Sequence, residues 1–292
     1  MRVSYLHGGD ILNTEKDILK TYSLRSGYDG ETVLRDVSIN FPSGKTTFVL
    51  GANGAGKSTL FLTLNGVIRP LSGSVAFCGE TVRYDKKSLK RLREKIGIVF
   101  QDPDDQLFCP TVYEDITFGA VNMGLDELEI RRRADCVMEI TETEAFKDKS
   151  IHALSFGQKK RTAIAGALIT APKLLLLDEP TAGLDPKGAA KIMRSLNDIK
   201  KKTGVTVVVS THDMDMAPVF AEHICLLDGG RAVFCGSPED FFKTPQLLRK
   251  HGLRLPRISH LFEILNKRDG VNTNASASTI SAARKELLKL IK

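Results

Sequence analysis

The chain of 292 residues has no long hydrophobic run. Its longest apolar clusters, residues 174–177 and 205–209, fall far below the roughly 18 residues that a membrane-spanning helix requires, and they predict short buried strands. Residues 1–10 lack the apolar stretch of a signal peptide, and no internal repeat is present. At this length the chain can bury one large core, alone or with an appendage.

Cysteine is scarce and scattered along the chain. Five residues occur, an odd number, and their spacing matches no metal-ligand pattern: Cys78, Cys109, Cys136, Cys225 and Cys235. This usage indicates buried thiols in a reducing compartment, and we therefore predict a cytosolic protein.

The net charge of +7 is concentrated at one end of the chain. Residues 243–292 carry eleven Lys and Arg against three acidic residues, while the remainder is nearly neutral. Such a basic segment suggests contact with an anionic membrane surface, an acidic partner or nucleic acid. A merely solvated tail is the alternative.

Strand-like and helical patterns alternate along the chain, which predicts an α/β domain with a parallel central sheet. The strands are expected at residues 18–50, 74–83, 96–100, 174–178 and 205–210. Residues 102–153 differ, with a capping box at Thr111 and Glu114 and a charged helical stretch at 126–140, and they predict an inserted helical subdomain. Asp228-Gly229-Gly230 predicts a hairpin that closes the core.

The predicted domain boundaries follow from these patterns. Residues 1–242 form the main domain, and residues 243–292 form a basic extension with a Gly/Asn/Ser/Thr linker at 270–279. The extension ends in a helix that places four apolar residues roughly on one face: Ile280, Leu287, Leu288 and Ile291.

A glycine-rich loop directly follows the strand-like residues 46–50. It reads Gly51, Ala52, Asn53, Gly54, Ala55, Gly56, Lys57, Ser58 and Thr59, and a helix is expected over 58–65. Glycines allow the backbone N–H groups to approach a polyphosphate. Lys57 would reach the β and γ phosphates and the Ser58 hydroxyl would bind Mg²⁺, so the loop predicts binding of a nucleoside triphosphate.

Polar residues follow three more predicted strands. Asp178 and Glu179 come after the four leucines at 174–177, Gln101 follows residues 96–100, and His212 follows 207–211. Because ligands bind at the carboxyl edge of a parallel sheet, we expect all of them at one site. Asp178 would complete the Mg²⁺ shell, Glu179 would polarise the attacking water, and His212 would contact the γ phosphate.

A second phosphate-binding device is expected at residues 154–158, which open a helix over 159–169. A helix N-terminus offers free N–H groups and a positive dipole end. One chain has a single γ phosphate, already held at 51–58, so this helix would serve a nucleotide on another copy. An ordinary capped helix is the alternative reading.

Taken in order, these segments resemble the ABC-type ATPases over residues ~11–240: Walker A at 51–59, Gln101, the signature at 154–158, Walker B at 174–179, the D-loop at 181–185 and the switch His212. Residues 98–108, 154–161 and 253–257 resemble the energy-coupling-factor branch of cobalt and nickel uptake. The resemblance implies a P-loop NTPase fold with an antiparallel β subdomain, a helical insertion and a small C-terminal extension.

The resemblance also implies an activity: an ATP-hydrolysing subunit that energises a membrane importer from the cytoplasmic face of the cell membrane. Glu179 would be the general base, Lys57 would neutralise charge, and Gln101 would position Mg²⁺ and water with Ser58 and Asp178. ATP would be held in a head-to-tail dimer, contacted in trans by Ser155, Gly157 and Gln158 of a second ATPase subunit, identical or paralogous. A separate membrane subunit would select the cargo, so no cargo-metal site is expected here.

Two features depart from the family pattern. Phe156 stands where the signature usually has glycine, and residues 1–17 and 19–27 fit poorly. The adenine-stacking aromatic is therefore assigned to Tyr28, with Tyr22 as a competitor.

An acidic cluster follows Gln101 and predicts a docking site. Asp102, Asp104 and Asp105 precede Leu107 and Phe108, which we expect to be exposed. A polytopic membrane subunit could dock here through a basic, partly apolar cytoplasmic helix. The rival reading is a non-transport ABC-type ATPase acting on nucleic acid or the ribosome. The chain has no coiled-coil insertion and no second ATPase copy, and the acids would repel nucleic acid, so none is expected as a partner.

Overall fold

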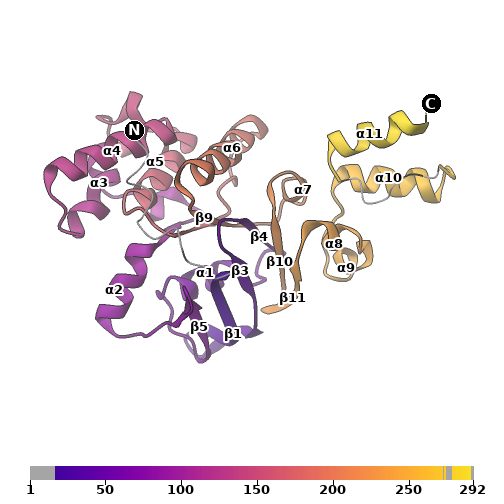
Figure 1. Ribbon diagram of the computed structural model, residues 1–292, viewed down its shortest axis with the longest axis horizontal. Helices are drawn as coiled ribbons and strands as arrows, with labels where there is room; N and C mark the ends of the chain where they lie inside the picture. The colour runs from indigo at the N-terminus through magenta and orange to yellow at the C-terminus, as the bar shows by residue number, and fades with distance from the viewer. Residues whose placement is uncertain (1–16, 272, 274–277, 291–292) are drawn as a thin grey trace.

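A computed structural model of the protein describes residues 17–271, 273 and 278–290, and it contains two β-sheets with helices around them (Figure 1). The larger sheet has the strand order β11-β10-β4-β9-β8-β7, parallel except for β11 at its edge. Its strands are β4 (Thr46–Leu50), β7 (Ile96–Val99), β8 (Leu174–Asp178), β9 (Thr206–Thr211), β10 (His223–Asp228) and β11 (Arg231–Gly236). The predicted parallel sheet and the closing hairpin are confirmed.

The second sheet is antiparallel, as the family resemblance implied. Its order is β2-β1-β5-β6, with β3 paired to β1. The strands are β1 (Asp17–Tyr28), β2 (Glu31–Val37), β3 (Asn40–Pro42), β5 (Ser72–Phe77) and β6 (Glu80–Thr81). Asp29 and Gly30, both with positive φ, make the two-residue turn between β1 and β2, a conformation that Asp and Gly tolerate best.

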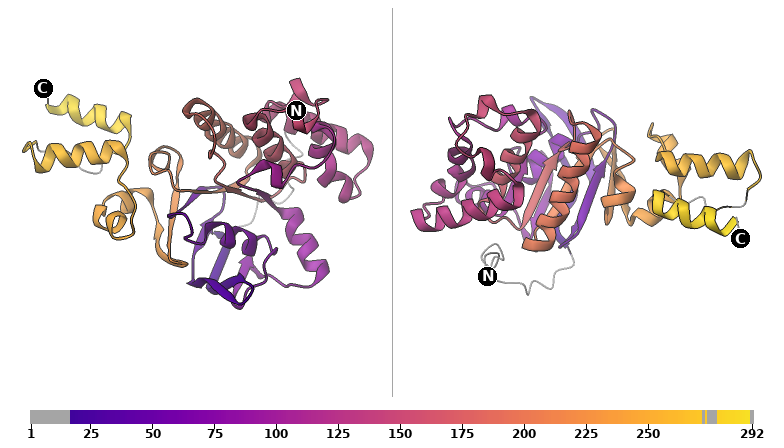
Figure 2. Two further views of the ribbon diagram at one scale, coloured as in Figure 1. Left: turned by 180° about the vertical axis from the view of Figure 1, so that it is seen from behind. Right: turned by 90° about the horizontal axis from the view of Figure 1, so that it is seen from above.

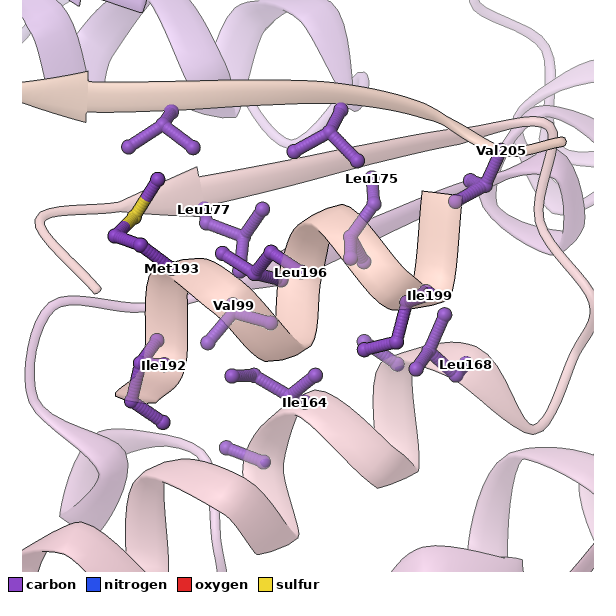
Figure 3. Packing of buried hydrophobic residues seen from close by; sticks show 14 of the residues in the cluster. Val99, Ile164, Leu168, Leu175, Leu177, Ile192, Met193, Leu196, Ile199 and Val205 are labelled. Atoms are coloured by element: carbon purple, nitrogen blue, oxygen red, sulfur yellow. The ribbon is translucent and has the colours of Figure 1, made fainter. Parts of the chain in front are cut away.

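The main sheet is buried on both faces, which explains the continuous leucines of β8. Because successive strand side chains point to opposite faces, Leu174 and Leu176 pack with α1 (Lys57–Leu64) and the antiparallel sheet. Leu175 and Leu177 face the other way, onto α5 (Phe156–Leu168) and α6 (Pro186–Thr203), as Figure 3 shows. The sheet therefore holds its strand ends rigidly between two apolar layers.

The region 102–153 is helical, as predicted. It contains η1 (Pro103–Asp105), α3 (Val112–Asn122), α4 (Glu127–Thr141), η2 (Glu144–Phe146) and η3 (Ile151–Ala153). The capping box is present, because Thr111 Oγ1 accepts from the Glu114 N–H (3.3 Å) and Glu114 Oε2 accepts from the Thr111 N–H (3.1 Å). Helix α2 (Lys86–Lys95) links the two sheets.

The last part of the chain is more helical than the sequence patterns indicated. The helices are α7 (Ala217–Phe220), α8 (Pro238–Phe242), α9 (Pro245–Lys250), α10 (Arg257–Lys267) and α11 (Ile280–Leu290), of which only α11 was predicted individually. Leu248, Leu253 and Leu255 belong to the main core, whereas Phe262 and Ala283 form a small core of their own. Figures 1 and 2 show α10 and α11 beside each other, apart from the sheets.

The boundary between residues 242 and 243 stays a prediction, and Ile291 lies outside the described residues. Among the helices that the structure describes, none combines the length and apolar character needed to cross a membrane.

Candidate active site

An open pocket of about 540 Å³ lies where the strands β4, β7 and β8 end. The glycine-rich loop, Gln101, Asp178 and Glu179 meet there, although they are far apart in sequence. The lining residues are Val33, Asn53, Gly54, Gly56, Lys57, Ser58, Thr59, Gln101, Asp178 and Glu179. The position agrees with the rule that ligands bind at the carboxyl ends of parallel strands.

The shape of the loop depends on its glycines. A Cβ on Gly51 would come within 2.5 Å of the Leu227 carbonyl oxygen. Gly56 has φ +101°, and a Cβ there would lie 2.9 Å from the Leu34 side chain. Ala55 is buried, and its carbonyl accepts from the Gly230 N–H at 3.2 Å, which ties the loop to the β10–β11 hairpin. The loop is thus held in one conformation by its surroundings.

Lys57 is folded back onto the loop and is almost completely buried. Its Nζ donates to the carbonyls of Gly51 (2.9 Å) and Ala52 (3.1 Å). The same ammonium lies 3.4 Å from Glu179 Oε1. The positive charge therefore sits at the inner end of the pocket, beside the residue that was predicted to be the base.

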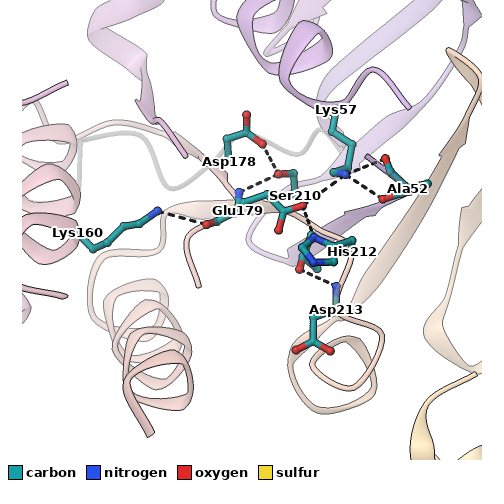
Figure 4. A network of polar contacts seen from close by, with 10 residues as sticks. Ala52, Lys57, Lys160, Asp178, Glu179, Ser210, His212 and Asp213 are labelled. Carbon is teal, nitrogen blue, oxygen red and sulfur yellow. Dashed lines mark hydrogen bonds and ion pairs between the residues drawn. The ribbon is translucent and has the colours of Figure 1, made fainter. Parts of the chain in front are cut away.

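Glu179 is held by contacts with several residues around it (Figure 4). Its Oε1 lies 3.0 Å from His212 Nδ1, and its N–H donates to Ser210 Oγ at 2.9 Å. Ser210 Oγ in turn donates to Asp178 Oδ1. Ser210 thus fixes the two carboxyl-bearing residues relative to each other, a role that no pattern in the sequence indicated. Glu179 also has φ +44°, a left-handed conformation that costs about 1–3 kcal/mol in a non-glycine residue.

Lys160 of α5 is a second functional-site residue that sequence reasoning missed. Its side chain is fully buried, and its Nζ lies 2.5 Å from the Gln101 carbonyl oxygen and 3.3 Å from that of Glu179. Burial lowers the pKa of Lys160 to about 8, although the nearby acids Asp102, Asp178 and Glu179 act in the opposite direction. The helix that begins at the signature is therefore attached directly to two predicted site residues.

The signature residues lie outside the pocket of their own chain. Ser155 caps α5, where Gln158 Oε1 accepts from the Ser155 N–H at 2.9 Å and Ser155 Oγ accepts weakly from the Gln158 N–H at 3.4 Å. Gly157 is uncrowded, since a Cβ there would meet only Leu184 at 3.6 Å. Ser155, Gly157 and Gln158 are absent from the lining of the pocket.

Phe156, the departure from the usual signature, packs against the D-loop. A Cβ on Gly183 would come within 2.8 Å of the Phe156 ring. Lys160 Nζ lies 5.5 Å from the centre of the same ring, within the range of a cation–π contact. The aromatic side chain therefore occupies space between the signature helix and residues 181–185.

Neither candidate for the adenine contact lines the described pocket. Tyr28 is 43% exposed and Tyr22 is 52% exposed. Tyr28 pairs with Glu31 at the tip of the β1–β2 hairpin, the hairpin that also supplies Val33 to the pocket. Tyr22 pairs instead with Ser74 of β5. The assignment to Tyr28 stays a prediction.

The acidic segment after Gln101 differs from expectation at one residue. Leu107 was expected to be exposed, and this is wrong: it is 7% exposed and belongs to the main core. The turn η1 reverses the chain, with the Leu107 N–H bonded to the Pro103 carbonyl at 2.9 Å, and this directs the side chain inward. Phe108 is 66% exposed and stacks edge-on against exposed Phe118, with ring centres 4.8 Å apart.

Comparison with known proteins places this geometry in a family. The ABC transporter family profile matches residues 34–182. The energy-coupling factor transporter ATP-binding protein EcfA3 of Clostridium perfringens is 47% identical over 274 residues, covering 94% of this chain and 96% of the relative. EcfA of Methanocaldococcus jannaschii is 45% identical over 276 residues, covering 94% and 98%.

Solved structures agree with the sequence comparison. The structure of cbiO1 from Clostridium perfringens, described as part of the ABC transporter complex cbiONQ, matches with TM-score 0.75 and 49% identity over 86% of this chain and all of that one. A dimeric ATP-binding cassette in a post-hydrolysis state with ADP and phosphate matches with TM-score 0.68 and 31% identity, covering 75% and 98%. The chain belongs to the ABC transporter ATP-binding family. Its predicted fold, its ATPase activity and its resemblance to the energy-coupling-factor branch are confirmed.

Proposed function

We propose that the chain is the ATP-hydrolysing subunit of a membrane importer and that it works as a nucleotide-sandwich dimer with a copy of itself or a paralogue. One observation carries the dimer: the pocket holds Lys57, Gln101 and Glu179, while the N-terminus of α5 lies outside it. A second subunit can supply Ser155, Gly157 and Gln158 to the open side of the pocket. In this assignment residues 1–242 are the ATPase domain and 243–292 its extension.

Each pocket residue has a chemical task in this proposal. ATP phosphates replace the Gly51 and Ala52 carbonyls as partners of the Lys57 ammonium. Glu179, released from Lys57 and still oriented by His212, accepts a proton from the attacking water. His212 is 56% exposed, so its free edge remains available to the γ phosphate.

Mg²⁺ fits the oxygen donors that the pocket collects. The Ser58 hydroxyl, the Gln101 amide and the Asp178 carboxylate are the hard ligands that this ion prefers. Bound with ATP, Mg²⁺ would neutralise phosphate charge. The hydrogen bond from Ser210 holds the Asp178 carboxylate at the C-terminal end of β8, where it can bind the ion.

The test is the substitution Glu179→Gln, which keeps the shape and hydrogen bonding of the side chain but cannot accept a proton. Turnover should fall ~10²–10⁴-fold while ATP binding remains. Lys57→Ala is the matched control, because it should lose ATP binding itself. Hydrolysis at the wild-type rate in Glu179→Gln would remove Glu179 as the base.

The same variant tests the dimer. Trapped with unhydrolysed ATP, Glu179→Gln should elute from size exclusion at twice the mass of the chain, and adding Ser155→Arg at the signature should restore the single mass. If the trapped protein with ATP stays a single chain, the homodimer is excluded and only a dimer with a paralogous chain remains.

The membrane partner is proposed to dock at Asp105, Phe108 and Phe118. Asp105 and Phe108 are exposed, and no ion pair involves Asp105 within the described part of the chain. Asp104, in contrast, pairs with Lys159 of α5 at 2.6 Å. A basic, partly apolar cytoplasmic loop complements this surface. The chain would then lie peripherally at the cytoplasmic face of the cell membrane.

The cargo, cobalt, nickel or another micronutrient, would be selected by a separate substrate-binding membrane subunit. This part of the proposal relies on similarity to the energy-coupling-factor proteins and to cbiO1 of the cbiONQ complex. Purification with native partners, followed by mass spectrometry, would identify the membrane subunits.

A further inference from the structure

Three potential metal ligands lie close together outside the ATP pocket. His223 and Cys225 lie on β10 and Cys235 lies on β11, and one ligand atom from each is within 4.8 Å of the others. The two sulfurs are 2.9 Å apart. His223 Nδ1 lies 4.0 Å from Cys225 Sγ, and its Nε2 lies 3.9 Å from Cys235 Sγ. The spacing of these two cysteines in the sequence matches no metal-ligand pattern, and only the fold brings their sulfurs together.

Strand geometry explains the cluster. Residues two apart on one strand share a face, so His223 and Cys225 point the same way. Cys225 pairs directly with Cys235 in the antiparallel register of β10 and β11. Cys225 belongs to the core shared with the antiparallel sheet, so this face is turned toward β3. Sheet pairing thus brings together donors that are separated by ten residues of chain.

Asn40 of β3 places its side-chain and backbone oxygens near the same cluster. Its Nδ2 donates to Asp17 Oδ1 at 2.8 Å, which fixes the amide so that the opposite atom, Oδ1, lies 3.5 Å from Cys235 Sγ. The backbone oxygen of Asn40 lies 3.9 Å from Cys225 Sγ and 3.8 Å from Cys235 Sγ. A fourth ligand is therefore available from the second sheet.

The cluster is largely shielded from solvent. Cys225 is fully buried, His223 is buried and Cys235 is half-buried. A metal ion held by these three side chains would therefore lie inside the fold, between the two sheets.

We propose that His223, Cys225 and Cys235 bind a metal ion of the Zn²⁺ class, with an oxygen of Asn40 as the fourth ligand. Two thiolates and an imidazole are ligands that this ion prefers, and an oxygen of Asn40 would complete four-coordination. At Zn–S lengths of roughly 2.3 Å the sulfurs would stand about 3.8 Å apart, so they must separate slightly, and the thiol protons leave to solvent when the ion binds. The ion would fasten β10 and β11 to β3 and would be structural, distinct from any transported cargo.

The experiment uses the full chain, purified reduced and metal-free, and titrated with Co²⁺ and Zn²⁺. We expect one equivalent of Co²⁺ to give the near-ultraviolet charge-transfer absorption of a cobalt–thiolate bond, displaced by Zn²⁺. Asp178, Glu179 and His212 could bind metal without any thiolate, and the absorption separates the two sites. Cys235→Ser should lose the absorption, and Cys109→Ser, a thiol elsewhere in the fold, should keep it.

Two results would overturn the proposal. One is the absence of thiolate absorption in the wild-type chain, including the case in which Cys225 and Cys235 are found oxidised to a disulfide by thiol counting. The other is unchanged absorption in Cys235→Ser. If that variant folds poorly, X-ray absorption on the zinc-loaded wild type decides the question, because two sulfur neighbours are required. The measurement is independent of ATP turnover and so does not depend on the proposed transport function.

Discussion

The buried ammonium of Lys160 should make the stability of the protein depend on pH to a measurable extent. Its pKa is about 8 in the folded chain and 10.5 when unperturbed, because burial disfavours the charged form. Between these values the unfolded state holds a proton that the folded state has lost. The free energy of unfolding therefore rises with pH across this window and is lowest, as far as Lys160 is concerned, below pH 8.

The magnitude follows from the size of the shift. This shift in the pKa of Lys160 corresponds to a change of about 3 kcal/mol in the free energy of unfolding between the two pKa values. The interval from about pH 7.5 to pH 9.5 covers only part of the window between the two pKa values, so we expect roughly 1–2 kcal/mol across it. Other groups titrate in the same range, but they cancel when wild type and a Lys160 variant are compared at both pH values.

The assay is urea unfolding of wild type, Lys160→Met and Lys160→Gln at the two pH values. Both variants should lose the pH-dependent increment. Lys160→Gln keeps donors for the carbonyls of Gln101 and Glu179, whereas Lys160→Met leaves them without this partner. Lys160→Met should therefore reduce ATP turnover more than Lys160→Gln, because the segment carrying Gln101 loses its attachment to α5. An identical pH dependence in wild type and both variants would show that Lys160 titrates normally, and the reasoning would fail.

Three further predictions concern the contacts around the site. Tyr28→Ala should weaken ATP binding about five-fold or more, since stacking on a base contributes ~1–3 kcal/mol, while Tyr22→Ala should leave it unchanged. Nucleotide titration measures both variants, and the reverse result would move the adenine contact to Tyr22. Gly183→Ala should slow ATP turnover, because the added Cβ would press on the Phe156 ring. In a Phe156→Gly background the loss of turnover should be smaller, with a coupling energy of roughly 0.5–3 kcal/mol between the two substitutions. Additive effects would mean that the two residues act separately. The double variant Asp105→Lys/Phe108→Ala should no longer co-purify with the membrane subunit, while its basal ATPase rate stays nearly unchanged. The control Glu80→Lys, which makes the same charge change on the exposed strand β6, should assemble normally. Assembly of the double variant would place the docking site elsewhere.

Part of this protein could be predicted from local sequence alone. The glycine-rich loop that ends in Lys57 is contiguous, and its chemistry depends on backbone freedom that only glycine provides. Asp178 and Glu179 follow a run of four leucines, which marks the end of a buried strand. Since parallel strands end at a common edge, the meeting of these residues with Gln101 follows from strand order, and the pocket shows that they do meet.

Other features depend on contacts between segments that are distant in the chain. Lys160 looks like an ordinary polar helix residue, and only the packing of α5 beneath the strand ends buries its charge beside two carbonyls. Leu107 follows three acids and looks exposed, but the turn η1 directs it into the core. Local periodicity carries no information about either, because burial at these positions is decided by what packs against them.

The sequence by itself determined the class of chemistry, because phosphate binding and water activation need particular residues at fixed local spacing. The tertiary structure decided which side chains support them: Ser210 orients Asp178 and Glu179 across two strands. It also gathered His223, Cys225 and Cys235 through the register of a β-hairpin. Such clusters arise from strand pairing and sheet packing, which act between residues and cannot be read from any one segment.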